Sequence, residues 1–289
     1  MSQVKRPGVY FHLHLVSDAT GETLNSISKA ICAQFENAKA IEHVYALVRS
    51  PRQLDQALRE IEGTPGIVLY TMMSDDLRKA LEDHCQKLSM PCVSVLDPVL
   101  SILANYLGTE GTHKAGGQHE LDAQYFNRID ALNFTMAHDD GQNAEDLQKA
   151  DLVLVGVSRT SKTPTCIYLA NRGIRAANVP VVKDAPLNVS FESLKRPLVV
   201  GLTVSSERLI QIRRHRLIAM QASTDTSYVE EEEVRKEIIF ARRLFEKHGW
   251  PVIDVSRRSI EETAAAILNF VSRRSQAESG GKIINRERM

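Results

Sequence analysis

Apolar and polar positions alternate along the chain with two different periods. Short apolar runs, typical of buried strands, are separated by stretches in which apolar residues recur every three to four positions, as on one face of a helix. Strand and helix alternate in this way four times before the first long polar segment, which predicts an open, mostly parallel sheet. The predicted strands are Val9–Val16, His43–Val48, Ile67–Met72 and Cys92–Leu96, and the predicted helices are Glu22–Phe35, Pro51–Ile61, Asp75–Leu88 and a last one that ends near Leu107.

The pattern breaks between Gly108 and Asp122, where the sequence is polar, rich in glycine and without a period. We interpret this segment as a linker or a mobile active-site loop. Beyond it, the alternation of strands and helices resumes and continues almost to the end of the chain. The predicted elements are helical segments at Ala123–Met136 and Ala144–Lys149, strands ending at Gly156 and spanning Pro180–Val182, Leu198–Leu202 and Val252–Val255, and helices at Tyr228–His248 and Ile260–Arg273.

Composition narrows the class of protein. The 289 residues carry 36 Lys and Arg against 36 Asp and Glu, and 43% of them are hydrophobic. This balance gives no electrostatic reason to expect a nucleic acid or a membrane as partner, and no apolar run approaches the roughly 20 residues that span a bilayer. We therefore expect a cytoplasmic protein. Its four cysteines form no C-x-x-C pair and are expected to be small buried hydrophobic residues.

The most specific motif follows the strand that ends at Gly156. A phosphate-binding loop, G-x-x-x-x-G-K-[ST], needs a glycine to leave the strand, backbone N–H groups for phosphate oxygens, a lysine for the terminal phosphates and a hydroxyl for Mg²⁺. Gly156, Lys162 and Thr163 fit this pattern, and Ser161 replaces the second glycine. Pro164 suits the first turn of a following helix, whose dipole favours an anion. The predicted nucleotide-binding residues are Gly156, Val157, Ser158, Arg159, Thr160, Ser161, Lys162 and Thr163; the alternative is an ordinary Ser/Thr-rich turn.

This motif completes the predicted architecture, an α/β fold in two parts. An N-terminal open parallel-sheet βα domain (residues 1–107) is followed by a P-loop kinase-like α/β domain (residues 144–275). In the second domain the order of loop, helix and strands resembles the core of the nucleoside-monophosphate kinases. Residues 108–143 form a linker with the His-Asp-Asp-Gly segment, and residues 276–289 are expected to be a disordered tail.

Two polar segments outside the loop are candidates for chemistry. Ser17–Thr23, with the sequence SDATGET, ends the first predicted strand, where ligands bind in open α/β sheets. Its hydroxyls and Gly21 suit a phosphate or a polar peptide group, with Asp18 beside them, but the same residues also suit a helix cap. The second segment, His138–Gly141, suits a general base, a Mg²⁺ ligand or both, whereas a solvated turn at a helix end is the alternative.

Two further patterns are less specific. Gly201–Arg216 follows a strand with a helix that carries four arginines, which suits a helix closing over a transferred phosphoryl group but equally a charged surface. His12 and His14 face the same side of a strand. Because no third ligand accompanies them, we expect no metal site there.

Taken together, these segments resemble a known family. SDATGETL, the stretch Asn127–Gly141, GVSRTSKTPTCIYLANRGIRAANVP and GLTVSSERLIQIR resemble, in this order, the bifunctional regulatory proteins of pyruvate, phosphate dikinase and of phosphoenolpyruvate synthase. The resemblance spans Phe11 to about Phe270. It implies a serine/threonine kinase, unrelated in fold to eukaryotic protein kinases, that uses ADP to phosphorylate a threonine and so inactivates its target. It also implies removal of that phosphate by phosphorolysis, which consumes inorganic phosphate and releases pyrophosphate.

The resemblance also assigns roles to residues. The loop binds ADP, with Lys162 holding the diphosphate, Thr163 helping to place Mg²⁺ and Arg159 reaching toward ligand or target. Serine at position 161 and the sequence SDATGET favour the dikinase-regulating branch over the synthase-regulating branch. A homodimer is a further expectation.

The acceptor side needs an acidic group that orients or deprotonates the threonine hydroxyl. We nominate Asp139 or Asp140, next to His138, with Asp18 as the third candidate. The SDATGET turn is the candidate for inorganic phosphate, and the sequence leaves open whether the two reactions share one site.

Two other classes of function account for part of the sequence. A small-molecule P-loop kinase would share the loop and the arginine helix but would not need a separate βα domain ahead of them. A non-catalytic nucleotide sensor would keep the loop and leave Asp139 and Asp140 dispensable.

Overall fold

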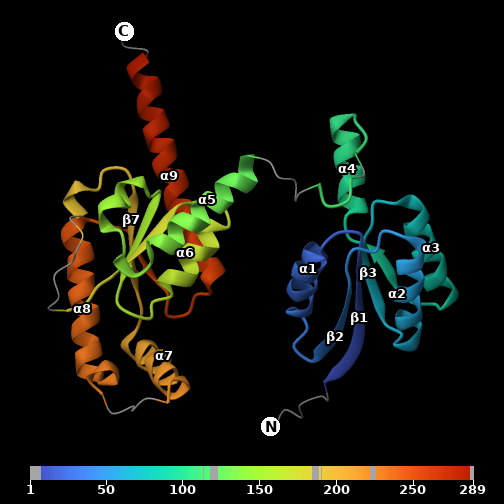
Figure 1. Cartoon of the computed structure of the whole chain (residues 1–289), viewed down its shortest axis with the longest axis horizontal. Helices are drawn as coiled ribbons and strands as arrows, with labels where there is room; N and C mark the ends of the chain where they lie inside the picture. Colours follow the sequence, from blue (N-terminus) through green and yellow to red (C-terminus); the bar gives the residue numbers. More distant parts are fainter. Residues whose placement is uncertain are drawn as a thin grey trace, which may run out of the picture. The chain divides into compact units, whose positions relative to one another are not determined.

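The computed structural model describes residues 8–112, 114–117, 123–183, 189, 191–221 and 226–286. The chain divides into two compact units, Met1–Glu120 and Leu121–Met289, each with its own four-stranded parallel sheet (Figure 1). This confirms the predicted α/β class. The division falls inside the predicted linker, of which residues 113 and 118–122 lie outside the described part of the chain.

The first unit has the strand order β2-β1-β3-β4. The chain runs from β1 to β2 on one side and then returns to β3 on the other, so the order reverses between β1 and β3. Helix α1 covers one face through Leu24, which packs on Leu13 and Leu15, whereas α2 and α3 cover the other. The elements are β1 (Val9–Ser17), α1 (Glu22–Cys32), β2 (Ala38–Tyr45), α2 (Pro51–Gly63), β3 (Ile67–Thr71), α3 (Asp75–Lys87), β4 (Cys92–Ser94) and α4 (Asp97–Leu107).

The second unit has the order β6-β5-β7-β8, with β5 and β7 in the interior of the sheet. Every residue of β5 is buried. The elements are α5 (Ala123–Ala137), β5 (Leu152–Gly156), α6 (Lys162–Ala170), β6 (Ala176–Pro180), β7 (Leu198–Thr203), α7 (Ser206–Ala219), α8 (Glu231–His248), β8 (Val252–Asp254) and α9 (Ile260–Arg286), with 3-10 turns at Asp139–Gly141, Ala144–Lys149, Phe191–Ser193 and Ser227–Val229.

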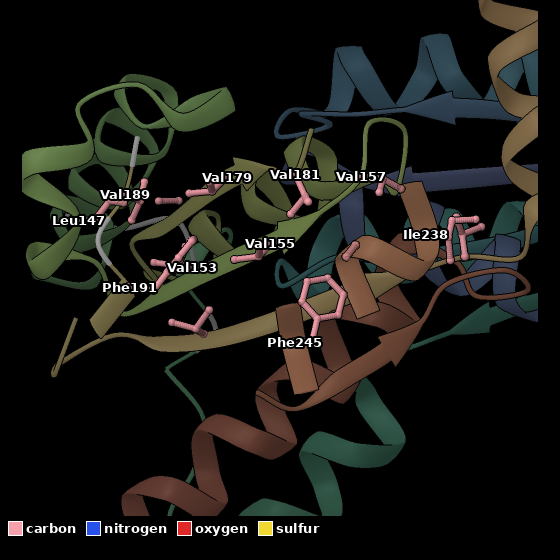
Figure 2. Packing of buried hydrophobic residues seen from close by; sticks show 14 of the residues in the cluster. Leu147, Val153, Val155, Val157, Val179, Val181, Val189, Phe191, Ile238 and Phe245 are labelled. Atoms are coloured by element: carbon pink, nitrogen blue, oxygen red, sulfur yellow. The ribbon is translucent and has the colours of Figure 1, made fainter. Parts of the chain in front are cut away.

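Side chains of β5 alternate between two cores, because successive residues of a strand point to opposite faces. Val153 and Val155 pack in the core that includes Phe245 of α8 (Figure 2). The leucines on either side of Val153 pack instead with residues of α6 and α9. Gly201 on β7 permits the close approach of α8, since a Cβ there would lie 2.6 Å from the Phe245 ring. Because helices cover both faces of this sheet, both sets of β5 side chains are buried, and the sequence of this strand is one continuous apolar run.

Several element boundaries differ from the prediction. Strand β2 spans Ala38–Tyr45. It ends before Val48 because Leu47 adopts a positive φ of 58°, its N–H donates to the Ala19 carbonyl, and the Val48 N–H donates to the carbonyl of Ser17 at the end of β1. Helix α5, predicted within the linker segment, belongs to the second unit: Thr135 donates to the carbonyl of Ala176 at 2.7 Å.

At the carboxyl end of the chain, α9 continues to Arg286. It thus extends through most of the segment for which we expected disorder, because adding residues to an existing helix is easier than nucleating one. Residues 287–289 lie outside the described part. Among the helices of the described residues, none combines the length and the apolar character needed to cross a membrane.

Candidate functional site

The loop between β5 and α6 lies at the carboxyl edge of the second sheet and has the geometry that the motif predicts. Gly156 ends the strand, and a Cβ there would lie 2.7 Å from the carbonyl oxygen of Leu202 and 2.9 Å from Oγ1 of Thr160. Thr160 in turn donates a hydrogen bond of 2.9 Å to the carbonyl of Val157 and fixes the turn. Helix α6 begins at Lys162, so Pro164 falls in its first turn, where its missing N–H is not needed.

Two loop residues have left-handed backbone conformations. Arg159 has a φ of 73° and Ser161 a φ of 58°. Left-handed residues within such a turn aim backbone N–H groups at a common point and form an anion-binding concavity. Ser161 therefore stands where glycine is common for a conformational reason, and its hydroxyl makes no capping bond to α6.

The Lys162 amine is buried beside the loop. Its side chain is part of a residue that is only 5% exposed, and Nζ donates to the carbonyl of Val157 at 3.0 Å. Burial lowers the pKa of Lys162 to about 8, although the carboxylates of Asp140 and Asp139 act in the opposite direction. The loop thus holds a poorly solvated positive charge, which attracts phosphate oxygens more strongly than an exposed lysine does.

The His-Asp-Asp-Gly turn lies against this loop. Thr163 Oγ1 donates to Asp139 Oδ1 at 2.8 Å, and the side-chain amide of Asn178 on β6 donates to the same oxygen. The backbone N–H of Asp140 donates to Asn178 Oδ1 at 3.2 Å, which aligns the turn with the sheet. The structure therefore brings together two motifs that lie apart in the sequence, and Asn178 links them.

The side chains of the His-Asp-Asp-Gly turn differ in the hydrogen bonds that they make. The Asp140 carboxylate is exposed and has no hydrogen-bond or ion-pair partner among the described residues, whereas Asp139 is bonded to the loop. The His138 ring is buried, stacks on Phe134 and bonds through Nδ1 to the Phe134 carbonyl at 2.7 Å. Nε2 of His138 has no partner in the described structure, and Nδ1 bonds within α5, so neither ring nitrogen bonds to a loop residue. The geometry gives His138 a role in fixing the turn.

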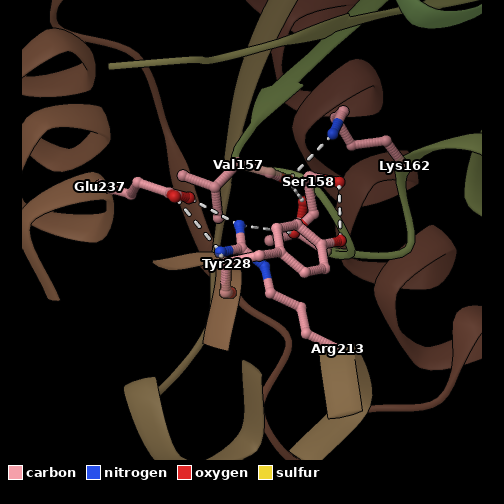
Figure 3. Close-up of polar contacts among 7 residues, drawn as sticks. Val157, Ser158, Lys162, Arg213, Tyr228 and Glu237 are labelled. Carbon is pink, nitrogen blue, oxygen red and sulfur yellow. Dashed lines mark hydrogen bonds and ion pairs between the residues drawn. The ribbon is translucent and has the colours of Figure 1, made fainter. Parts of the chain in front are cut away.

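A buried arginine supports the loop from the other side (Figure 3). Arg213 of α7 is 1% exposed and forms a bidentate ion pair with Glu237 of α8, at 2.6 and 3.2 Å. It also donates to the carbonyls of Tyr228, at 2.9 Å, and of Ser158 in the loop, at 3.5 Å. The sequence suggested an arginine reaching for a phosphoryl group, but this arginine is bound to the protein. The sequence contains one indication of this burial: Arg213 follows Leu209 by four positions, which places both residues on the buried face of α7.

The SDATGET turn lines a cavity of about 40 Å³ in the first unit, and the cap position of α1, Gly21, makes no side-chain capping bond, which contradicts the alternative of a side-chain helix cap. Helix α1 begins after Gly21, whose φ is 77°, and no side chain caps it. Asp18 is buried, with Oδ2 accepting the N–H of Met73 at 2.6 Å. His12 and His14 lie near His43, yet within the described residues no group of three or more His, Cys, Asp or Glu is placed to hold a metal.

Comparison with known proteins agrees with this geometry. The model of a family described as Kinase/pyrophosphorylase matches residues 13–268. A protein of Caulobacter vibrioides, named as a pyruvate, phosphate dikinase regulatory protein, is 57% identical over 267 residues, which cover 92% of this chain and 85% of that protein. Proteins named in the same way from Hyphomonas neptunium (55% over 276 residues; 95% and 99%) and Maricaulis maris (56% over 261 residues; 90% and 93%) are similarly close. The chain therefore belongs to the kinase/pyrophosphorylase family.

Proposed function

We propose that this protein regulates pyruvate, phosphate dikinase by two opposed reactions on one threonine of that enzyme. In the first, the β-phosphoryl group of ADP moves to the threonine hydroxyl, AMP leaves and the dikinase is inactivated. In the second, an oxygen of inorganic phosphate attacks the phosphothreonine, pyrophosphate leaves and the hydroxyl is restored. The observation that carries the proposal is the contact between the phosphate loop and the acidic turn, Thr163 to Asp139 at 2.8 Å.

The donor side consists of the loop Gly156–Thr163. Its backbone N–H groups and the buried Lys162 amine suit the diphosphate of ADP, since phosphoryl transfer depends mainly on positioning and on neutralising charge. Arg159 is exposed on the same loop and is available to ligand or target. Binding of a diphosphate adds negative charge beside Lys162 and so keeps its amine protonated.

Mg²⁺ fits the residues present. The Thr163 hydroxyl and the Asp139 carboxylate are oxygen donors, which Mg²⁺ prefers, and Asp139 Oδ2 makes no hydrogen bond in the described part of the chain. These two residues would hold the ion together with water and phosphate oxygens. Bound there, Mg²⁺ would supply positive charge to the diphosphate.

On the acceptor side, Asp140 is the better base of the two carboxylates. Its side chain is exposed and uncommitted, whereas Asp139 already accepts two hydrogen bonds. Among the neighbouring carboxylates, Asp140 raises the pKa of Lys162 the most, which supports a position of Asp140 close to this amine. We therefore assign removal of the threonine proton to Asp140 and positioning of Thr163 to Asp139. Asp18 belongs to the first unit and has a different environment.

A direct test uses the full chain with purified dikinase and, separately, with phosphoenolpyruvate synthase, each incubated with ADP labelled in its β-phosphate. We expect labelled phosphothreonine in the dikinase alone, and release of the label as pyrophosphate when inorganic phosphate is added. Label in the synthase alone would reassign the target. Label in neither protein, with ADP still consumed in the presence of a small metabolite, would favour a small-molecule kinase.

A further inference from the structure

Three histidines gather on one face of the first sheet, and none of them takes part in the chemistry proposed above. His12 and His14 extend from β1, and His43 pairs with His14 in the register of β1 and β2. The ring centroids of His14 and His43 lie 4.7 Å apart, and those of His12 and His43 lie 5.1 Å apart. Since β2 is an edge strand that pairs with β1 alone in the described sheet, this histidine cluster lies across the junction that holds β2 (Figure 1).

The His14 ring is buried and bonded in its neutral form. The residue is 0% exposed, and Nε2 bonds to the carbonyl of Thr64, the cap residue of α2, at 2.7 Å. Because a carbonyl oxygen only accepts, Nε2 carries the ring proton and Nδ1 keeps its lone pair. That lone pair accepts the hydroxyl of Tyr45 at 3.2 Å, so both ring nitrogens are satisfied without a charge.

His12 and His43 form a pair beside this buried ring. Nδ1 of His12 lies 2.8 Å from Nε2 of His43, so one of these nitrogens donates and the other accepts. Both residues are partly exposed, and the pair can take up one proton while it keeps this hydrogen bond. A second proton would break the bond and place two positive charges side by side. In the described part of the chain, no carboxylate bonds to any ring of the cluster.

The surroundings of His14 oppose a positive charge on its ring. Burial lowers the pKa of His14, and the two other rings of the cluster lower it further, although the Thr64 carbonyl acts in the opposite direction. The other ionisable side chains around this face are Tyr10, Lys39, Tyr45 and Tyr70 on the strands, with Glu60 and Glu82 on the covering helices α2 and α3. Of these groups, the Tyr45 hydroxyl alone bonds to His14 in the described structure, and burial raises the pKa of Tyr45, so it stays neutral. Acid below the ordinary histidine pKa of about 6.5 therefore favours states in which the His14 ring reaches solvent.

Strand β2 leads directly into a segment that holds the turn after β1. The N–H groups of Leu47 and Val48 donate to carbonyls at the end of β1 and in that turn, both at 2.9 Å. Arg49 Nε donates to the carbonyl of Asp18 at 2.7 Å. A movement of β2 away from β1 would therefore loosen the turn as well.

We propose that His12, His14 and His43 form a pH-sensitive switch that holds the edge strand β2 on β1 only while the His14 ring is neutral. When the cluster takes up protons, adjacent rings on the two strands become charged, and β2 opens locally together with residues 47–49. The switch concerns the first unit alone and does not rest on the function proposed above.

The size of the effect follows from the proton that His14 gains on opening. We take the ring as neutral in the closed state and as having its ordinary pKa of about 6.5 in the open state. The equilibrium constant for opening then rises about tenfold between pH 7.5 and pH 5.5. Most of this rise falls below pH 6.5, where the open state binds a proton that the closed state does not.

The test measures amide hydrogen exchange of the full chain by mass spectrometry at pH 7.5 and pH 5.5. The rates are expressed as protection factors, which removes the intrinsic pH dependence of exchange. We expect the protection of β2 to fall about tenfold between the two pH values, whereas that of β3, in the interior of the same sheet, should change less than about twofold. An unchanged β2, or equal falls in β2 and β3, would overturn the proposal, because the second result means that the whole unit unfolds.

His14→Gln removes the titrating ring and keeps an N–H donor for the Thr64 carbonyl. The fall in β2 protection between the two pH values should shrink to about threefold or less. This ratio is the readout, so a loss of stability that is the same at both pH values does not imitate the result. His215→Gln, at an exposed position on α7, is the matched control and should keep the full fall. A tenfold fall that persists in His14→Gln would exclude His14 as the switch.

A measurement on the parent protein needs no substitution and so covers a His14→Gln variant that does not fold. The NMR titration of the ring nitrogens should show His14 with its proton on Nε2 and with a midpoint below that of the exposed His215. A His14 midpoint equal to or above that of His215 would contradict the proposal.

Discussion

Replacing Lys162 with methionine should stabilise the second unit while abolishing phosphoryl transfer. Lys162 as a whole residue is 5% exposed, and burial lowers the pKa of its amine from 10.5 to about 8. At about 1.4 kcal/mol for each pH unit, this difference makes the charged lysine cost the folded state about 3 kcal/mol at pH 7. Methionine fills a similar space without charge, so the variant should unfold at a free energy higher by up to that amount. Transfer should fall at least ~10²-fold, because the loop loses its charge on the diphosphate.

The sign of the pH dependence distinguishes this explanation from a simple packing effect. Below pH 8 the lysine is protonated in both the folded and the unfolded state, so the full cost is present. Between about pH 8 and 10.5 the folded state has already released the proton that the unfolded state still binds. The parent protein therefore gains stability with rising pH in this window, and its difference from Lys162→Met should shrink toward zero near pH 10.5.

Urea unfolding followed by the fluorescence of Trp250 measures this difference. Trp250 is the only tryptophan of the chain and packs against the core of the second unit, so its signal reports that unit. Lys79→Met, at an exposed position in the first unit, is the control and should change nothing in this signal. A Lys162→Met variant that is less stable at pH 7, or a difference that is the same at pH 7 and pH 10, would refute the reasoning.

Asp140→Asn should remove threonine phosphorylation yet keep ADP affinity within about twofold, because a base acts on the acceptor. Asp139→Asn should instead weaken the binding of ADP with Mg²⁺. Equal effects of the two substitutions on ADP affinity in calorimetry would contradict this division of roles. Ser161→Gly should keep ADP affinity within about tenfold, under ~1.4 kcal/mol, since glycine adopts a φ of 58° more easily than serine; a drop of several hundredfold would mean that the hydroxyl contacts phosphate or metal. Glu237→Gln should destabilise the second unit by about 3 kcal/mol in urea unfolding, because it leaves Arg213 buried without its countercharge. Glu246→Gln, on the exposed side of the same helix, is the control and should have almost no effect. Similar losses of stability in both variants would show that the ion pair is not the cause.

Local patterns in the sequence were sufficient to predict the parallel α/β class and the strand–loop–helix order around Gly156, but the strand predicted at Pro180–Val182 lies at Ala176–Pro180. Gly156 at the end of a buried strand and Lys162 at the start of a helix are recognisable from their immediate neighbours in the sequence. In the structure they are the two ends of a single loop, between β5 and α6. The strand β2 was displaced in the prediction because Leu47 and Val48 are apolar and yet belong to a bend that packs against the turn after β1. Within this bend Val48 is buried but Leu47 is 48% exposed, so apolar character alone shows neither that a residue is extended nor that it is buried.

The contacts that complete the site could not be derived from spacing. Thr163 and Asp139 are 24 positions apart, and Asn178, which joins them, looks like any polar residue within a strand. Four arginines on one segment suggested phosphate binding, but only the packing of α7 against α8 shows which of them faces inward. The contact between Arg213 and Glu237 depends on how α7 and α8 pack against each other, and the sheet beneath these helices sets that packing.

The two groups of residues, those that the sequence identifies and those that it does not, have opposite effects on stability. The recognisable loop residues cost the folded state free energy: Arg159 and Ser161 are left-handed without being glycine, and Lys162 is a buried amine. The unrecognised contacts hold these residues in place, as Arg213 does through the Ser158 carbonyl and Asn178 through the acidic turn. The anion site that we propose needs both, because a loop with the motif alone would relax away from its left-handed backbone geometry. It follows that variants of the supporting residues should lower stability and nucleotide affinity together, whereas variants of the loop lysine separate the two.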